Sequence, residues 1–424
     1  MIGMADRDAA AYLVLARADL LTERPTLLDQ DVVTMGRLSG VGAANPPNTV
    51  ILRWADLGVV ELTARTVDGS RRAQQVTTGD RLFDSLLPGS PVTALARQIT
   101  ADGPVQPATP LLYAIHTGQT LHLYSRVEIA ADDACFLRTA TVRAPADGLH
   151  NLDWLRAALQ THAALASTLN SYQCYFRKAF PGQELEHKYT LPDNAPIWAL
   201  AADTHHRVHA GHLPGFTLKY HDELQSWDYL NHLFDIDEPA TERGYVSFIP
   251  SITTPGWRMK RKWFTTDSFA RREQLTDLPP IDGSLDDYVH DVLRLQARRL
   301  PTFRRIRYDV NVESLATGHY YGVFFDRCHL TEQPAQAMCQ CEIEYCNSRT
   351  TRPPDEAEVL SEMERVATWV GTVLDDHNLP TRRSHYSKLS YLRDAVATPW
   401  PAARPATFSI PWMGNRDRPR RDWK

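Results

Sequence analysis

The sequence predicts an α+β protein whose first part is rich in strands and whose second part mixes strands with helices. Up to about residue 145, short apolar runs alternate with Gly, Pro and Asp turns, which is typical of strands joined by tight connections. From Asp153 the apolar residues change to helical spacing. We therefore expect a strand-rich α+β domain over residues 1–165, a second domain over 166–400 and a basic tail over 401–424.

Three elements have clear sequence signals at their ends. Two apolar runs over 111–127 flank a turn that contains Gly118, and a glycine there can supply the positive φ of a β-hairpin. Ser284 stands ahead of Leu-Asp-Asp, as an N-cap does, and predicts a helix that continues to about Leu300. Apolar residues at three- and four-residue spacing predict another helix over 355–376.

Composition excludes several classes of protein. With 424 residues, 43% hydrophobic and 23% charged, the chain can form more than one core and is not expected to be disordered. Its formal net charge of -5 argues against a nucleic acid or a membrane as partner. The six cysteines are too few for a disulfide framework, and the spacing of Cys339, Cys341 and Cys346 matches no common zinc pattern, so we expect reduced thiols.

The apolar segments are too short to span a membrane. No stretch approaches the roughly 18 uncharged apolar residues of a spanning helix, and charges such as Asp6, Arg7 and Asp19 interrupt the first 21 residues. These charges break any signal-peptide core. The sequence therefore predicts a cytoplasmic protein, and it fixes no oligomeric state.

Two short segments place carboxylates on one face of a strand. Glu184, Glu186 and Lys188 alternate in the first segment, and Glu342 and Glu344 alternate in the second. Because successive side chains of a strand point to opposite faces, each set shares one surface. Each pattern alone is also what a solvated strand face would show.

Two other segments place basic residues on one strand face. Their members are Arg258, Lys260 and Lys262 in one segment and Arg305 and Arg307 in the other. Acidic and basic rows facing each other across a closed barrel would complement an anionic ligand with its metals. Carboxylates suit Mg2+ or Mn2+, and Arg and Lys bind phosphate oxygens. The alternative is four independent solvated faces.

The ordered set of motifs resembles the CYTH, or triphosphate tunnel metalloenzyme, superfamily, whose signature is E-x-E-x-K. Glu184, Glu186 and Lys188 match that signature, and Glu342 and Glu344 match the family's second acidic pair. The remaining motif positions resemble its basic strands, its late acidic residue and its closing lysine; they are Arg258, Lys260, Lys262, Arg305, Arg307, Asp326 and Lys388. The resemblance covers about residues 175–395, and the domain ahead of it departs from the common pattern.

The resemblance implies a tunnel of eight antiparallel strands with flanking helices that binds a triphosphate through two divalent ions. Three of the implied roles are catalytic, for Lys188, Glu184 and Glu186. The implied substrate-binding residues are Arg258, Lys260, Lys262, Arg305, Arg307 and Lys388. The implied ligands of Mg2+ or Mn2+ are Glu184, Glu186, Asp326, Glu342 and Glu344.

The expected function is metal-dependent hydrolysis of a small-molecule triphosphate or related phosphoester. Three alternatives stay open: a class IV-like adenylate cyclase, a polyphosphate- or nucleotide-binding module without turnover, and an enzyme of specialised metabolism acting on a diphosphate or another phosphoester. The sequence contains no G-x4-G-K-[ST] loop, which excludes the P-loop NTPases.

Overall fold

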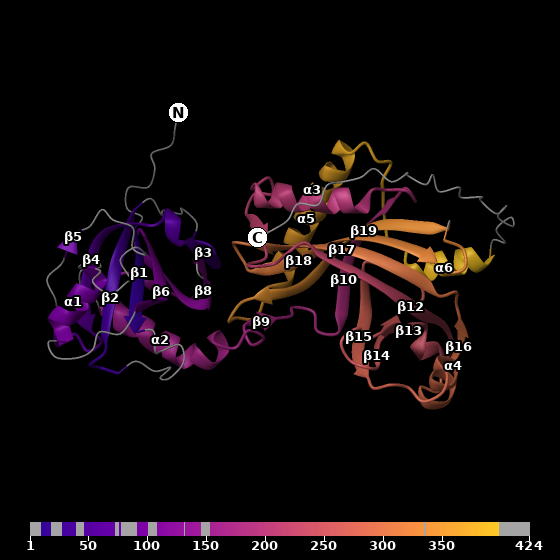
Figure 1. Ribbon diagram of the computed structural model, residues 1–424, viewed down its shortest axis with the longest axis horizontal. Helices are drawn as coiled ribbons and strands as arrows, with labels where there is room; N and C mark the ends of the chain where they lie inside the picture. The colour runs from indigo at the N-terminus through magenta and orange to yellow at the C-terminus, as the bar shows by residue number, and fades with distance from the viewer. Residues whose placement is uncertain are drawn as a thin grey trace, which may run out of the picture.

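A computed structural model describes the chain over residues 10–17, 28–39, 46–72, 76–77, 91–100, 108–130, 132–145, 153–334 and 336–397. Figure 1 shows two β-structures along its length, with the N-terminal sheet at the left and a larger strand assembly at the right. The predicted basic tail over 401–424 lies outside the described residues. No helix in the described ranges is both long enough and apolar enough to cross a membrane.

The N-terminal part is an eight-stranded antiparallel sheet with the order β3-β8-β7-β6-β1-β2-β4-β5. Its strands are β1 (Ala10–Arg17), β2 (Val32–Ser39), β3 (Thr49–Arg53), β4 (Gly58–Thr66), β5 (Val76–Thr77), β6 (Ala108–Thr117), β7 (Thr120–Ile129) and β8 (Asp133–Arg143). The predicted hairpin is confirmed as β6 and β7, and Gly118 has the positive φ of 55° that its turn requires.

A helix covers each face of this sheet. The first helix, α1 (Pro91–Thr100), packs Val92 and Leu95 into the core on one face, and α2 (Asp153–Leu169) packs Trp154 and Leu155 into the core on the other. Strands buried on both faces need apolar residues at both parities. The continuous apolar run Leu111–Ile115 of β6 satisfies this need.

The second part contains a closed barrel of eight antiparallel strands. The pairings run β17-β18-β19-β10-β15-β14-β13-β12, and β12 pairs with β17 to close the ring. These strands are β10 (Gln183–Leu191), β12 (Gln225–Glu238), β13 (Gly244–Pro250), β14 (Trp257–Trp263), β15 (Ala270–Leu278), β17 (Phe303–Ser314), β18 (His319–Leu330) and β19 (Ala337–Arg349). The predicted α+β fold with an eight-stranded antiparallel tunnel is confirmed.

Short strands and helices flank the barrel. The short strands are β9 (Phe176–Arg177), β11 (Phe216–Leu218), β16 (Gln296–Arg299) and β20 (Arg382–Ser384). The helices α3 (Ile197–His209) and α5 (Glu356–Asp376) lie on the outer face of β17, β18 and β19 (Figure 1). Outward residues such as Val323, Cys341 and Ile343 are fully buried beneath them, so their neighbours of opposite parity point into the barrel.

The two predicted helices of this part have different outcomes. The helix over 355–376 is confirmed as α5, which begins after its N-cap Asp355. The helix from Ser284 to Leu300 is wrong beyond its first turns. Ser284 forms a capping box over α4 (Leu285–Asp287), but a π-helical turn ends at Val292 and β16 then pairs with β12. The edge of β12 offers hydrogen bonds that outweigh the local helical signal.

A buried ion network joins the N-terminal sheet to the barrel. The guanidinium of Arg349 is fully buried, donates to Glu313 at 2.9 Å and forms an ion pair with Glu128 of β7 at 2.8 Å. Asn48 donates to the carbonyl oxygen of Arg349 at 2.9 Å, and Thr49 donates to Glu313 at 3.1 Å. A buried cation held by two carboxylates fixes its partners strongly, because losing either one leaves a charge uncompensated.

Candidate active site

The barrel interior contains a cavity of about 100 Å³ whose wall is strongly charged. Seven basic side chains line it: Lys188, Lys260, Lys262, Arg271, Arg305, Arg307 and Lys388. Three acidic side chains line it as well: Glu184, Glu342 and Glu344. On each strand, the charged residues of this lining are at positions whose side chains point into the barrel. Closure of the barrel therefore brings side chains from distant parts of the sequence to one cavity.

The first charge cluster consists of Asp326 and Glu342 with the cations around them. Arg305 donates to Asp326 at 2.9 Å and to Glu342 at 3.0 Å. Arg307 does the same at 2.8 Å and 2.6 Å. Burial raises the pKa of the Glu342 carboxyl, but Lys388, Lys188 and Arg305 outweigh it and hold that pKa well below its usual range. The pKa of Asp326 is raised by burial and by the neighbouring Glu342.

The second charge cluster consists of Glu184, Glu273 and Glu344 with two lysines. Lys260 and Lys262 lie 3.1 and 3.3 Å from Glu273, and Lys262 also forms an ion pair with Glu184. Although burial raises the pKa of Glu273, the two lysines lower it to about 2. By contrast, the pKa of Glu344 is raised well above its ordinary value by burial and by the charges of Glu184 and Glu273.

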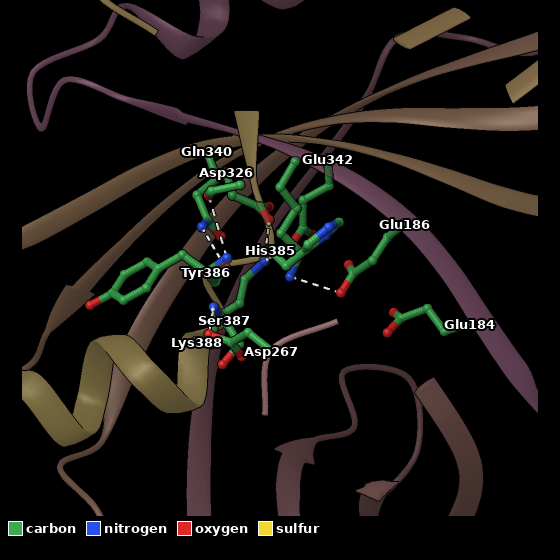
Figure 2. A network of polar contacts seen from close by, with 12 residues as sticks. Glu184, Glu186, Asp267, Asp326, Gln340, Glu342, His385, Tyr386, Ser387 and Lys388 are labelled. Carbon is green, nitrogen blue, oxygen red and sulfur yellow. Dashed lines mark hydrogen bonds and ion pairs between the residues drawn. The ribbon is translucent and has the colours of Figure 1, made fainter. Parts of the chain in front are cut away.

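The helix α6 (Lys388–Ala397) packs against the barrel strands through Leu389 and Leu392 and supplies the last lysine. Figure 2 shows the segment His385–Lys388 lying against Asp326, Gln340 and Asp267. The Lys388 ammonium lies 3.0 Å from Asp326 and also pairs with Glu342. Backbone contacts fix this segment, because Gln340 donates to the Tyr386 carbonyl at 2.8 Å and the Ser387 amide donates to Asp267 at 3.2 Å.

Three of the predicted site residues do not line the cavity. Asp326 is fully buried behind its cations. Glu186 is also buried, 2.6 Å from Arg271 and 2.8 Å from Lys188. Arg258 lies at the end of β14, where its exposed guanidinium pairs with Asp277 at 2.9 Å. The other predicted residues lie together on the cavity wall: Glu184, Lys188, Lys260, Lys262, Arg305, Arg307, Glu342, Glu344 and Lys388.

Two charged residues of β15 belong to the interior but were not predicted. Arg271 lines the cavity, and Glu273 pairs with both lysines of β14. They alternate in Ala270-Arg-Arg-Glu-Gln, so the same strand pattern could have identified them. The uncharged lining of β12 and β13, including Tyr229 and Asn231, has no charge pattern that would identify it from sequence.

The carboxylates differ in how well they suit a divalent metal. Among the described residues, no group of three or more His, Cys, Asp or Glu side chains surrounds one metal position. In the first charge cluster, lysine and arginine groups occupy the space around Asp326 and Glu342. The donor chemistry fits better at Glu344, whose pKa is raised by burial and also by repulsion from Glu184 and Glu273, which a cation would relieve.

Comparison with known proteins found no matching family model and no matching curated protein. The solved structures similar to this chain include a putative adenylate cyclase from Bacillus halodurans, with 13% identity over 45% of this chain and 91% of that one and a TM-score of 0.26. They also include the Pct1 RNA triphosphatase of S. pombe in complex with the Spt5 CTD, with 11% identity over 54% and 92% and a TM-score of 0.23. At such low identities and scores, neither assigns a function to this chain.

Proposed function

We propose that the protein binds the triphosphate group of a small molecule inside the barrel and hydrolyses a phosphoanhydride bond. The observation that carries this proposal is the convergence of seven lysine and arginine side chains on one cavity. Guanidinium groups bind phosphate oxygens as planar forks and ammonium groups bind them as point charges. A wall of this kind suits a polyanion much better than a neutral or cationic ligand.

The charge balance of the cavity supports a divalent cation as a second component. The lining cations are already nearly matched by the lining carboxylates together with Glu186, Glu273 and Asp326. The terminal phosphate of a triphosphate alone adds about 1.5 to 2 negative charges at pH 7, which leaves the site short of positive charge. We propose that Glu184 and Glu344 hold Mg2+ or Mn2+, which supplies positive charge to the phosphate oxygens.

The chain's own groups would then have distinct roles in hydrolysis. Arg305, Arg307 and Lys388 exchange part of their contact with Asp326 and Glu342 for the phosphate oxygens and stabilise charge that develops in the transition state. A water oxygen attacks the terminal phosphorus, and the bridging P–O bond breaks, with the electron pair leaving on the diphosphate. The attacking water loses its proton to solvent, because Glu184 and Glu344 are the residues proposed to hold the metal.

The test is product analysis with tripolyphosphate, ATP and thiamine triphosphate in the presence of Mg2+ or Mn2+. We expect release of inorganic phosphate, and a loss of roughly a hundredfold or more in Glu184→Gln. The matched control is Glu332→Gln, which changes an exposed glutamate outside the cavity lining. Release of a cyclic nucleotide instead of phosphate would identify a cyclase, and binding without turnover would identify a binding module.

A further inference from the structure

The cavity wall is uncharged on one side. Apart from Ser387, which precedes α6, its uncharged residues come from β12, β13 and the start of β17, and they are Tyr229, Asn231, Leu233, Tyr245, Ser247, Ile249 and Phe303. The charged residues come from the other strands, from β17 beyond Phe303, and from α6. A ligand that consisted of phosphate groups alone would have no use for the uncharged side.

Packing against α6 explains part of this uncharged side. Leu233, Tyr245 and Phe303 belong to one apolar cluster with Leu389 and Leu392 of that helix, so they serve to pack α6 against the barrel. The residues that this cluster does not include are Tyr229, Asn231, Ser247 and Ile249.

Asn231 is the residue of this group that lacks a structural explanation. Its relative exposure is 5%, yet its side-chain Nδ2 has no hydrogen-bond partner among the described residues. A buried amide without a partner is destabilising, and folded proteins contain few of them. Because Asn231 lines the cavity, a ligand in the cavity can supply the missing partner.

The strand register places Asn231 two residues from Tyr229, which lies opposite Arg305, one of the cations proposed to bind phosphate. In the pairing of β12 with β17, Tyr229 lies opposite Arg305 and Asn231 lies opposite Phe303. The Arg305 guanidinium is 6.0 Å from the centre of the Tyr229 ring. A triphosphate held by Arg305 would therefore lie near the ring of Tyr229 and, two residues further along β12, near the unpaired amide nitrogen of Asn231.

We propose that Asn231 determines specificity by hydrogen bonding to the organic group of a triphosphate ester, so that the barrel prefers an organic triphosphate to inorganic tripolyphosphate. This inference rests on the proposed function, since it requires a triphosphate in the cavity. Tyr229 and Ser247 supply an aromatic face and a hydroxyl beside the amide, which suits a polar ring or sugar. A site with a buried group built to hydrogen-bond its ligand discriminates against ligands that leave the group unpaired.

Calorimetric titration at fixed Mg2+ tests the inference without depending on turnover. The probes are tripolyphosphate, ATP, GTP, UTP and thiamine triphosphate. We expect at least one ester to bind wild type more tightly than tripolyphosphate does. Asn231→Leu, which keeps the side-chain volume, should weaken binding of that ester roughly three- to tenfold and leave tripolyphosphate binding unchanged.

The control is Asn347→Leu, which makes the same change on β19 outside the cavity lining. Asn231→Ala provides a second variant if the leucine is not accommodated, and circular dichroism checks that each variant is folded. An equal loss for the ester and for tripolyphosphate would mean that Asn231 contacts phosphate, and no loss would mean that it contacts neither; both results overturn the inference. If wild type binds neither tripolyphosphate nor any of the esters, the proposed function itself fails.

Discussion

Asp309 provides a quantitative test of the electrostatics inside the barrel. This carboxylate lies two residues beyond Arg307 on β17 and accepts a 2.9 Å hydrogen bond from the indole Nε1 of Trp227. Burial and the charge of Asp326 raise its pKa from 3.8 to about 7. The perturbation is Asp309→Asn, which keeps an acceptor for Trp227 but cannot ionise.

The size and sign of the effect follow from the shift in the pKa of Asp309. The folded protein binds this proton more tightly than the unfolded chain, so the group's contribution to stability is greatest at low pH and is lost as pH rises toward 7 and above. A shift of about three pKa units corresponds to at most about 4 kcal/mol. Integrated between pH 5.5 and 8.5, the advantage of Asp309→Asn over wild type should grow by about 2 kcal/mol.

The assay is urea unfolding of wild type and variant at pH 5.5 and 8.5, followed by tryptophan fluorescence. The control is Asp277→Asn, because Asp277 is exposed and its hydrogen bond with Arg258 lowers its pKa, so that variant should gain no stability at high pH. If the difference in unfolding free energy between Asp309→Asn and wild type stays constant with pH, the raised pKa of Asp309 is refuted.

Three further predictions concern other buried charges. Glu344→Gln should stabilise the protein at high pH by about 1–2 kcal/mol, because it removes a buried carboxylate held near Glu184. Turnover of triphosphate should be lost in the same variant. A variant that is neither more stable nor less active would contradict the role of Glu344. Arg305→Met should weaken tripolyphosphate binding roughly ten- to a hundredfold, as expected for a charge-assisted contact, and unchanged affinity in calorimetry would exclude Arg305 from the site. Arg349→Met should lower the free energy of unfolding by about 3–5 kcal/mol, since Glu313 would remain buried without its cation, and an unchanged urea midpoint would show that this network is dispensable.

A separate prediction concerns the proposed metal. Treatment with EDTA should abolish phosphate release, and added Mg2+ or Mn2+ should restore it, because the triphosphate leaves the cavity short of positive charge. Activity that is indifferent to chelation would contradict the metal proposal while leaving the phosphate-binding cations in place.

Strand alternation was sufficient to predict much of the barrel interior. Because the side-chain period of a strand is two, Lys260 and Lys262 share one face, and so do Arg305 and Arg307. Ring closure then brings both pairs to the same cavity. The acidic pair at 342 and 344 follows the same rule. Cys341 has the opposite parity, and its side chain packs in the apolar core beneath the helices, as expected.

Other features depend on the three-dimensional arrangement and could not be predicted from the sequence. Arg258 has the same parity on β14 as Lys260 and Lys262, as predicted. Its place at the end of the strand nevertheless leaves its side chain exposed. Residues beyond Val292 form β16 because an edge of β12 is free to pair with them. Asn231 has no recognisable pattern around it, and its lack of a partner becomes visible only when the whole wall is assembled.

The most direct test of the central claim is calorimetric titration of tripolyphosphate, with Mg2+ present, into wild type and into the double variant Lys260→Met, Arg305→Met. Arg305 belongs to the first charge cluster and Lys260 to the second, and both side chains line the same cavity. The charged-cavity account predicts saturable binding by wild type at one site and its loss in the folded double variant. Equal binding by both proteins would place the anion elsewhere and contradict the account.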